Sequence, residues 1–284
     1  MRNNVRSNIL RLLAAIGGAL FSVLPLHADD RAPELEYVPV DRIAKYSPLF
    51  IGETHGTREV AGFVTDLISH SVKTSPVDLM LELPADMNEL IQHYFSDTIT
   101  SKELLGHSFW TRNIQDGRSS VAVFNLIKRV KALRGERKAV DIIAFDTRRD
   151  GKKKLGDRET IMAQNISAHI EKANEHVIII VTGRVHANKA LLLDNNRQAV
   201  ATQLTESQRF TSVNMVATSG DYWACFSHPE KIFDCGRKVI GARQMTGFDQ
   251  AMPEGIYINM KSDKHFDGIL FFRHVESSPP AINR

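Results

Sequence analysis

Two short turns in the sequence carry the residue types that acid–base chemistry needs. The first turn, Gly52-Glu53-Thr54-His55, follows the apolar run 48–51, and the second, Gly183-Arg184-Val185-His186, follows the apolar run 177–181. Parallel strands bring their carboxyl ends to one edge of a sheet, where α/β proteins bind ligands. The repeated Gly-x-x-His pattern therefore predicts one shared site. The alternative is that each glycine only allows a tight turn and each histidine packs or caps a helix.

The first turn places a carboxylate beside an imidazole. Glu53 and His55 are two residues apart, and on an extended segment such residues share a face. This pairing suits a general base that activates water. Glu82 lies in the apolar run 79–84 and needs a basic partner, because an unpaired buried acid is costly. We predict that His55, Glu53, Glu82 and His186 are catalytic, although Glu82 could instead form a salt bridge that closes the sheet.

Further charged residues are expected at the same edge of the sheet. Asp146 ends the apolar run 142–145, and Arg58, Arg184 or a histidine could be the partner of Glu82. Acids at the ends of several parallel strands converge on one crevice. We therefore expect Asp146 and Arg184 to belong to the substrate-binding part of the site.

Several reaction classes lack their sequence motifs. The chain has no His-Glu-x-x-His helix, no Gly-x-Ser-x-Gly elbow and neither of the common phosphate-binding glycine loops. Hydrolysis by activated water is the reaction type that remains. The alternative is a divalent metal site with His55, His186 and Glu53 as ligands.

The apolar patterns predict an α/β fold with a mainly parallel sheet flanked by helices. Continuous apolar runs typical of strands buried on both faces are Leu49–Gly52, Asp78–Leu83, Val140–Asp146, His176–Thr182, Val213–Thr218 and Gly268–Phe272. Helical periodicity marks the segments Glu59–Ser71, Val121–Leu133 and Asp157–Ala173. This alternation favours two related βαβ halves, each with a Gly-x-x-His turn at a strand end. The aromatic-containing segment 87–117 could form a helical cap over the strand ends.

The first 28 residues have the pattern of a secretory signal peptide. Arg2, Arg6 and Arg11 precede or interrupt an apolar stretch that ends before Asp29. We expect cleavage, an exported, periplasmic or secreted product without a stable membrane anchor, and a single domain over residues 29–284. The alternative is an uncleaved anchor.

Charge argues against nucleic acid as a partner. The formal net charge is +3, and the three arginines of the signal segment account for it, so the mature chain is near neutral. The basic run 148–154 is expected to be a solvated loop, with an anion site as the alternative. A small-molecule substrate or ligand is the expected partner.

The chain has two cysteines, Cys225 and Cys235. An even number of cysteines in an exported chain predicts a disulfide. Their spacing matches no common zinc pattern, so a structural disulfide is the favoured interpretation.

Four segments resemble the erythromycin esterase superfamily. They are the opening motif at 51–59, the helix at 157–166, the second histidine turn at 183–187 and the final strand at 266–272. The resemblance runs in order over nearly all of the mature chain. The superfamily also contains ChaN-like haem-binding lipoproteins and Tiki/TraB-type proteins, some of them metal-dependent proteases.

The resemblance implies roles for individual residues. His55 would be the general base, Glu53 and Glu82 would assist it, and His186 would line the opposite wall. Arg58, Glu59 and Arg158 lie in the matched motifs and would pair with acids or bind an oxyanion. The leading interpretation is an exported hydrolase for an ester or amide that needs no cofactor. The alternatives are a haem- or small-ligand-binding protein, with Tyr94 or a histidine as haem ligand, and a metal-dependent protease.

Overall fold

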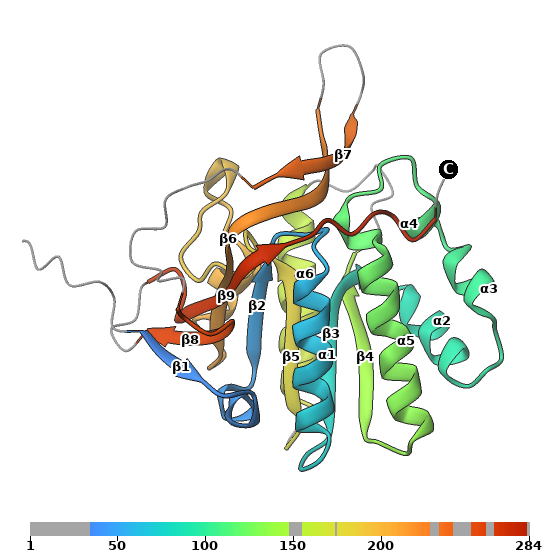
Figure 1. Cartoon of the computed structure of the whole chain (residues 1–284), viewed down its shortest axis with the longest axis horizontal. Helices are drawn as coiled ribbons and strands as arrows, with labels where there is room; N and C mark the ends of the chain where they lie inside the picture. Colours follow the sequence, from blue (N-terminus) through green and yellow to red (C-terminus); the bar gives the residue numbers. More distant parts are fainter. Residues whose placement is uncertain are drawn as a thin grey trace, which may run out of the picture. The chain divides into compact units, whose positions relative to one another are not determined.

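Six strands of one sheet run parallel, and all six are those that the apolar runs predict (Figure 1). In the computed structural model the described residues are 35–147, 155–173, 175–227, 233–240, 251–259 and 264–282. They belong to the unit Pro33–Arg284. The predicted signal peptide 1–28 and the basic run 148–154 lie outside the described residues.

The strands of the described part form a nine-stranded sheet in the order β1-β8-β9-β6-β2-β5-β3-β4, with β7 pairing with β6. Their bounds are β1 Leu35–Val38, β2 Leu49–Glu53, β3 Val77–Pro84, β4 Val140–Asp146, β5 Val177–Gly183, β6 Thr211–Phe226, β7 Asp234–Val239, β8 Gly255–Asn259 and β9 Gly268–Val275. Strands β1, β7 and β8 pair antiparallel with their neighbours, whereas the others pair in parallel where they meet. The predicted α/β class with a mainly parallel sheet is confirmed.

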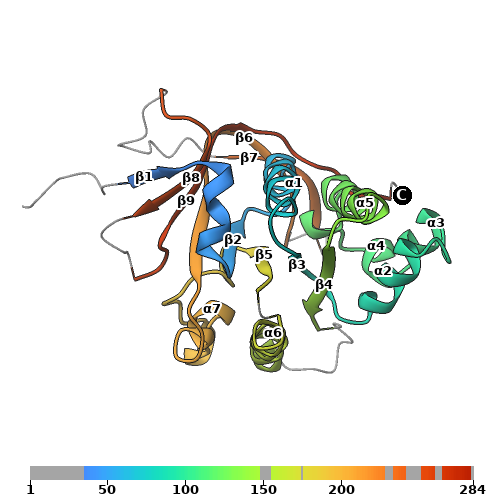
Figure 2. The same ribbon diagram turned by 90° about the horizontal axis from the view of Figure 1, so that it is seen from below.

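Helices cover both faces of the sheet (Figure 2). Their bounds are α1 Glu59–Ser71, α2 Met87–Phe95, α3 Ser101–Leu105, α4 Ser108–Thr111, α5 Val121–Gly135, α6 Leu155–Ile170 and α7 Val200–Leu204, with short 3₁₀ turns at η1 Val40–Tyr46, η2 Gly117–Ser119 and η3 Asp194–Asn196. Helices α1 and α5 lie on one face, and α6 and α7 lie on the other. The three predicted helices correspond to α1, α5 and α6. In the described part, no helix is long and apolar enough to cross a bilayer.

Alternating side chains of the parallel strands build a separate core on each face. Leu49 and Ile51 of β2 pack in the core under α1 and α5, whereas Phe50 packs in the core under α6 and α7. Ile179 and Ile180 of β5 divide between the two cores in the same way. Because both faces are buried, the strands are continuously apolar, which is why their positions are readable in the sequence.

The two βαβ units interleave. The unit β2-α1-β3 crosses over β5, and the unit β4-α6-β5 crosses over β3 in the opposite direction, as the strand order requires. Two crossovers of the same handedness that run in opposite directions along a sheet place their helices on opposite faces. Helices α1 and α6 do lie on opposite faces. Interleaving makes β2 and β5 neighbours, with Glu53 paired to Gly183. The two Gly-x-x-His turns therefore lie side by side at one edge.

The segment 87–117 lies mainly beside the sheet. Helix α2 lies along β4, where Asn88 exchanges two hydrogen bonds with the backbone of Ala144, at 2.9 and 2.7 Å. An amide that donates and accepts in this way satisfies the open edge of a sheet and blocks further strand pairing. The predicted cap over the strand ends is therefore replaced by an edge cover, and only Asp116 and Gly117 of this segment line the cleft described below.

A second charged cluster lies at the amino end of the strands, away from the turns. Oδ2 of the buried Asp78 is 2.8 Å from Nε2 of His169 and 2.9 Å from Nδ1 of His176. Burial raises the pKa of Asp78, but the hydrogen bonds from His169 and His176 outweigh it and the pKa is lowered.

Replacing this aspartate should destabilise the fold. We expect Asp78→Asn to lower the free energy of unfolding by about 2 kcal/mol, because hydrogen bonds to a charged group are lost. The loss should shrink as the pH falls through the lowered pKa of Asp78, since protonation removes the same charge from the wild type. Urea unfolding at several pH values measures it. The exposed Asp66→Asn is the control, and equal stability of the two variants would contradict the prediction.

Candidate active site

The turn that carries His55 is held from three sides. Gly56 has a φ of 81°, and a Cβ there would lie 2.2 Å from the carbonyl oxygen of Trp223. The Gly56 carbonyl accepts hydrogen bonds from the backbone N–H groups of Trp223, at 3.0 Å, and Ser278, at 2.7 Å. A Cβ on Gly117 would lie 2.1 Å from the Gly56 nitrogen. Close backbone approach and a left-handed φ both require glycine at position 56.

Glu82 is the centre of the site. Its Oε1 accepts hydrogen bonds from Arg158 at 2.7 Å and Arg118 at 3.0 Å, and its Oε2 accepts from the Thr182 hydroxyl at 2.7 Å and the Gly183 N–H at 2.8 Å. The side chain is buried. Four donors satisfy both oxygens, so this strand residue can remain a carboxylate in an apolar surrounding.

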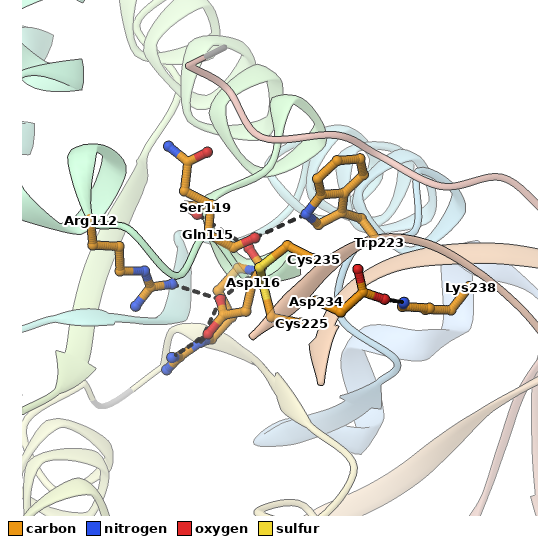
Figure 3. Close-up of a disulfide and its surroundings, with 10 residues drawn as sticks. Arg112, Gln115, Asp116, Ser119, Trp223, Cys225, Asp234, Cys235 and Lys238 are labelled. Atoms are coloured by element: carbon orange, nitrogen blue, oxygen red, sulfur yellow. Dashed lines mark hydrogen bonds and ion pairs between the residues drawn. A yellow bond between two sulfur atoms is a disulfide. The ribbon is translucent and has the colours of Figure 1, made fainter. Parts of the chain in front are cut away.

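Two further acids hold the arginines in place. Asp146 accepts from Arg158 at 2.8 and 2.7 Å and from Arg118 at 3.1 Å. Asp116 binds Arg118 through both oxygens, the shortest contact being 2.8 Å, and also accepts from Arg112 at 2.6 Å (Figure 3). Burial raises the pKa of Asp116, but the guanidinium of Arg118 outweighs it and lowers the pKa to about 2. Asp116 is therefore ionised at neutral pH.

The two histidines flank Glu82, one at each oxygen. Nε2 of His55 lies 3.4 Å from Oε2 of Glu82, and Nε2 of His186 lies 3.7 Å from Oε1. Nδ1 of each ring meets a second carboxylate, Glu53 at 2.8 Å and Glu159 at 2.9 Å. The two turns that are far apart in sequence thus meet at one carboxylate.

The surroundings of His55 favour its protonated form. Burial lowers the pKa of His55, but the charges and hydrogen bonds of Glu82 and Glu53 outweigh it and raise the pKa to about 10. At neutral pH the ring is therefore an imidazolium that donates from Nδ1 to Glu53 and forms an ion pair with Glu82 through Nε2. Burial raises the pKa of Glu82, whereas His186, His55 and Arg118 hold it well below its ordinary value.

His186 has a different environment. Nη1 of Arg158 lies 3.1 Å from Nε2 of His186, and Oε2 of Glu159 lies 2.9 Å from its Nδ1. The ring is thus held between a cation and an anion, and its position depends on the same arginine that binds Glu82.

These groups line one cleft of about 850 Å³. The predicted catalytic residues Glu53, His55, Glu82 and His186 all belong to its lining, as do Arg158 and Arg184. Arg184 is exposed, and the part of the chain that the structure describes offers it no ion pair. A cleft that combines convergent polar groups with a shifted pKa is the usual setting of an active site.

Three predicted binding residues lie elsewhere. Arg58 forms an exposed ion pair with Glu276 at 2.8 Å, and Glu59 accepts from the backbone N–H of Glu276 at 3.0 Å. Both residues attach the carboxyl-terminal segment to α1 and are absent from the cleft lining. Asp146 lies beside the arginines that bind Glu82 but is absent from the cleft lining. Its oxygens accept hydrogen bonds from Arg118, Arg158 and the Thr147 N–H, so it supports the site without facing the cleft.

The alternative cofactors fit this arrangement poorly. In the described part of the chain, no group of three or more His, Cys, Asp or Glu side chains is arranged to hold a metal ion. Both nitrogens of His55 face carboxylates and Nε2 of His186 faces Arg158, so the proposed ligands His55, His186 and Glu53 are committed to one another and to protein partners. Tyr94, the candidate haem ligand, is buried among the helices beside β4 and accepts a hydrogen bond from Ser101.

Three residues of the centre have no clear signal in the sequence. Asp116 lies at the irregular end of the segment 87–117 and Arg118 directly follows that segment, where nothing in the local pattern marks an arginine as buried. Glu159 lies beside Arg158 on α6, and its contact with His186 depends on how α6 packs. A buried strand acid such as Glu82 did indicate that a basic partner must exist, but not which one.

Gly183 leaves room for the His55 ring. A Cβ at this position would lie 2.8 Å from Nε2 of His55. We expect Gly183→Ala to push the ring away from Glu82 and to lengthen the 3.4 Å contact between them. The free energy of unfolding should change by about 1 kcal/mol or less, because a side-chain end can move. A crystal structure of the variant and urea unfolding measure these outcomes.

The matched control for this variant is Gly62→Ala. A Cβ at Gly62 meets no atom within 4 Å, and the residue lies inside α1. This change should leave His55 in place and stabilise the helix by up to about 1 kcal/mol. If His55 of Gly183→Ala occupied its wild-type position, the account of this contact would be wrong.

Comparison with known proteins extends the description of the fold. No protein-family model matches the chain, and no curated protein matches it. A Bacillus cereus protein of known structure matches with a TM-score of 0.60 at 11% identity, over 86% of this chain and 94% of that chain. A succinoglycan biosynthesis protein matches with a TM-score of 0.57 at 10% identity, over 84% of this chain and 91% of that chain.

A third match is a histidine-to-asparagine mutant of erythromycin esterase EreC in its open conformation. Its TM-score is 0.56 at 11% identity, over 84% of this chain and 92% of that chain. The resemblance inferred from the sequence motifs is thereby confirmed at the level of the fold. This chain has the fold of erythromycin esterase EreC.

Proposed function

We propose that the protein is a hydrolase that uses water to cleave an ester or amide. The observation that carries the proposal is the position of His55, held between Glu53 and Glu82 on the lining of a large cleft. An imidazole whose pKa is shifted by two carboxylates is a group prepared to move a proton. The shared fold with an erythromycin esterase supports this class of reaction.

We propose that His55 acts as the general acid rather than the general base. The sequence pattern predicts a base, but a ring with a pKa of about 10 already holds both protons at neutral pH. It can therefore protonate a leaving group. Glu53 is the better candidate for the base, because His55 occupies only its Oε1 and the residue lines the cleft.

The proposed reaction has two proton transfers. Glu53 takes a proton from water as its oxygen attacks the substrate carbonyl carbon. The tetrahedral intermediate carries a negative oxygen, which Arg184 at the rim of the cleft is placed to neutralise. When the intermediate collapses, the bond to the leaving oxygen or nitrogen breaks and His55 donates its Nε2 proton to that atom. Glu53 then releases its proton to solvent, and His55 takes one up.

Export is part of this proposal. It is supported by the disulfide between Cys225 and Cys235, which the sequence predicts and the structure contains. Disulfides persist in oxidising compartments outside the cytosol. The substrate is therefore a small molecule met in the periplasm or outside the cell.

The pH dependence distinguishes the two roles of His55. If His55 is the acid, kcat/KM for a p-nitrophenyl ester should be maintained to alkaline pH and fall as the pH rises through about 10, where the ring loses its proton. A general-base role predicts the opposite slope, with activity rising toward the same pH. Stopped-flow or plate-reader assays that correct for spontaneous ester hydrolysis measure this profile.

Substitution of the two proton carriers provides a second test. His55→Gln and Glu53→Gln should each lower kcat by about 10²–10⁴-fold, the usual contribution of general acid–base catalysis. His93→Ala is the matched control, since this exposed histidine on α2 is not part of the cleft lining. Wild-type turnover in His55→Gln would refute the proposed function.

A further inference from the structure

The cleft has one charged wall and one apolar wall. The residues of β2, β3, β5 and α6 described above form the charged wall. The apolar side chains come from β6, from β7 and from the residue after β7, and include Val216, Tyr222, Trp223, Phe226, Val239 and Ile240. Strands β6 and β7 continue beyond the rest of the sheet as an antiparallel hairpin (Figure 1).

Two apolar side chains of this hairpin are unusually exposed. Val239 is 79% exposed and Phe226 is 50% exposed, and Val239 has the highest exposure among the large apolar side chains of the described residues. Exposed apolar groups that adjoin a polar cleft mark a surface that binds an apolar partner.

The hairpin is fixed with respect to His55. The disulfide joins Cys225 of β6 to Cys235, its partner on β7. Nε1 of Trp223 donates to the Gln115 carbonyl at 2.9 Å (Figure 3), and the Trp223 N–H donates to Gly56, the residue that follows His55. The apolar wall therefore has a set position relative to the proton donor, as a binding subsite requires.

We propose that this hairpin is the subsite for an apolar body attached to the reacting carbonyl, so that the substrate class is esters or amides of apolar acids. This inference rests on the proposed hydrolase function. Phe226 and Val239 lie on opposite faces of the hairpin, since Phe226 pairs with Asp234 and Val239 pairs with Asp221. Both line the cleft that contains His55 and Glu53, so a ligand with its carbonyl at the charged wall lays its acyl part on the hairpin. Burial of that part supplies binding energy remote from the reacting atoms.

The test uses p-nitrophenyl esters from acetate to octanoate. Wild-type kcat/KM should rise along the series by up to about fourfold for each fully buried methylene. Val239→Glu and Phe226→Ser should each flatten this rise, because each removes apolar surface from the subsite. Leu192→Ser is the control, since Leu192 is 56% exposed but lies outside the cleft lining. A chain-length dependence that survives in both hairpin variants would overturn the proposal.

Binding of octanoate separates this proposal from the hydrolase proposal. Calorimetry should show octanoate binding to wild type and to His55→Gln, and loss of binding in Val239→Glu. If octanoate binds in this way but the wild-type protein has no esterase activity, the subsite proposal is supported and the hydrolase proposal is refuted. Octanoate binding that is absent, or equal in wild type and Val239→Glu, would refute the subsite. Sedimentation of the protein with phosphatidylglycerol vesicles, abolished by Val239→Glu while the ester series is unaffected, would also refute it and identify the hairpin as a lipid contact.

Discussion

Glu82 is a buried carboxylate near the carboxyl end of β3, and the arrangement of the cleft depends on the need to neutralise its charge. Burying an ionised acid here without a partner would cost too much free energy, so Arg118 and Arg158 both form ion pairs with it. Each arginine needs further acids, which Asp146 and Asp116 supply. The result is a closed network of charge-assisted hydrogen bonds with the two imidazoles at its surface. The network stabilises the geometry more than it adds net stability, since buried ion pairs repay little beyond their desolvation.

Chain topology brings the members of this network together. The interleaved crossovers make β2, β5 and β3 neighbours, which places the two histidine turns on either side of Glu82. The remaining wall comes from outside the parallel core. Three segments contact Gly56 and so hold the His55 turn: the β6–β7 hairpin, the end of the segment 87–117 and the carboxyl-terminal segment. Conformation of the reactive turn thus depends on three segments that are distant in sequence.

Sequence patterns predict the parallel half of this protein well. Continuous apolar runs reveal strands buried on both faces, and the strand-end positions of Glu53, Glu82 and His186 follow from them. The antiparallel strands β1 and β7 are partly exposed and mixed in polarity, and β8 is only five residues long, so they leave no comparable signal. Arg58 and Glu59 belong to the first motif but face the carboxyl-terminal segment, because α1 begins there and turns them away from the cleft. Arg118 is beyond prediction, since its burial arises from tertiary packing of an irregular segment. The protonation of His55 could not be read from Glu53 alone, because Glu82 approaches the ring only through the fold.

The most direct test of the central role of Glu82 is an NMR titration of the His55 ring nitrogens in wild type and in Glu82→Gln. Wild-type His55 should carry protons on both nitrogens until the pH approaches about 10. In Glu82→Gln the pKa should fall by about 1–3 units, because one of the two neighbouring charges is gone. A wild-type ring that titrates near the ordinary histidine value of about 6.5, unchanged by Glu82→Gln, would contradict the account.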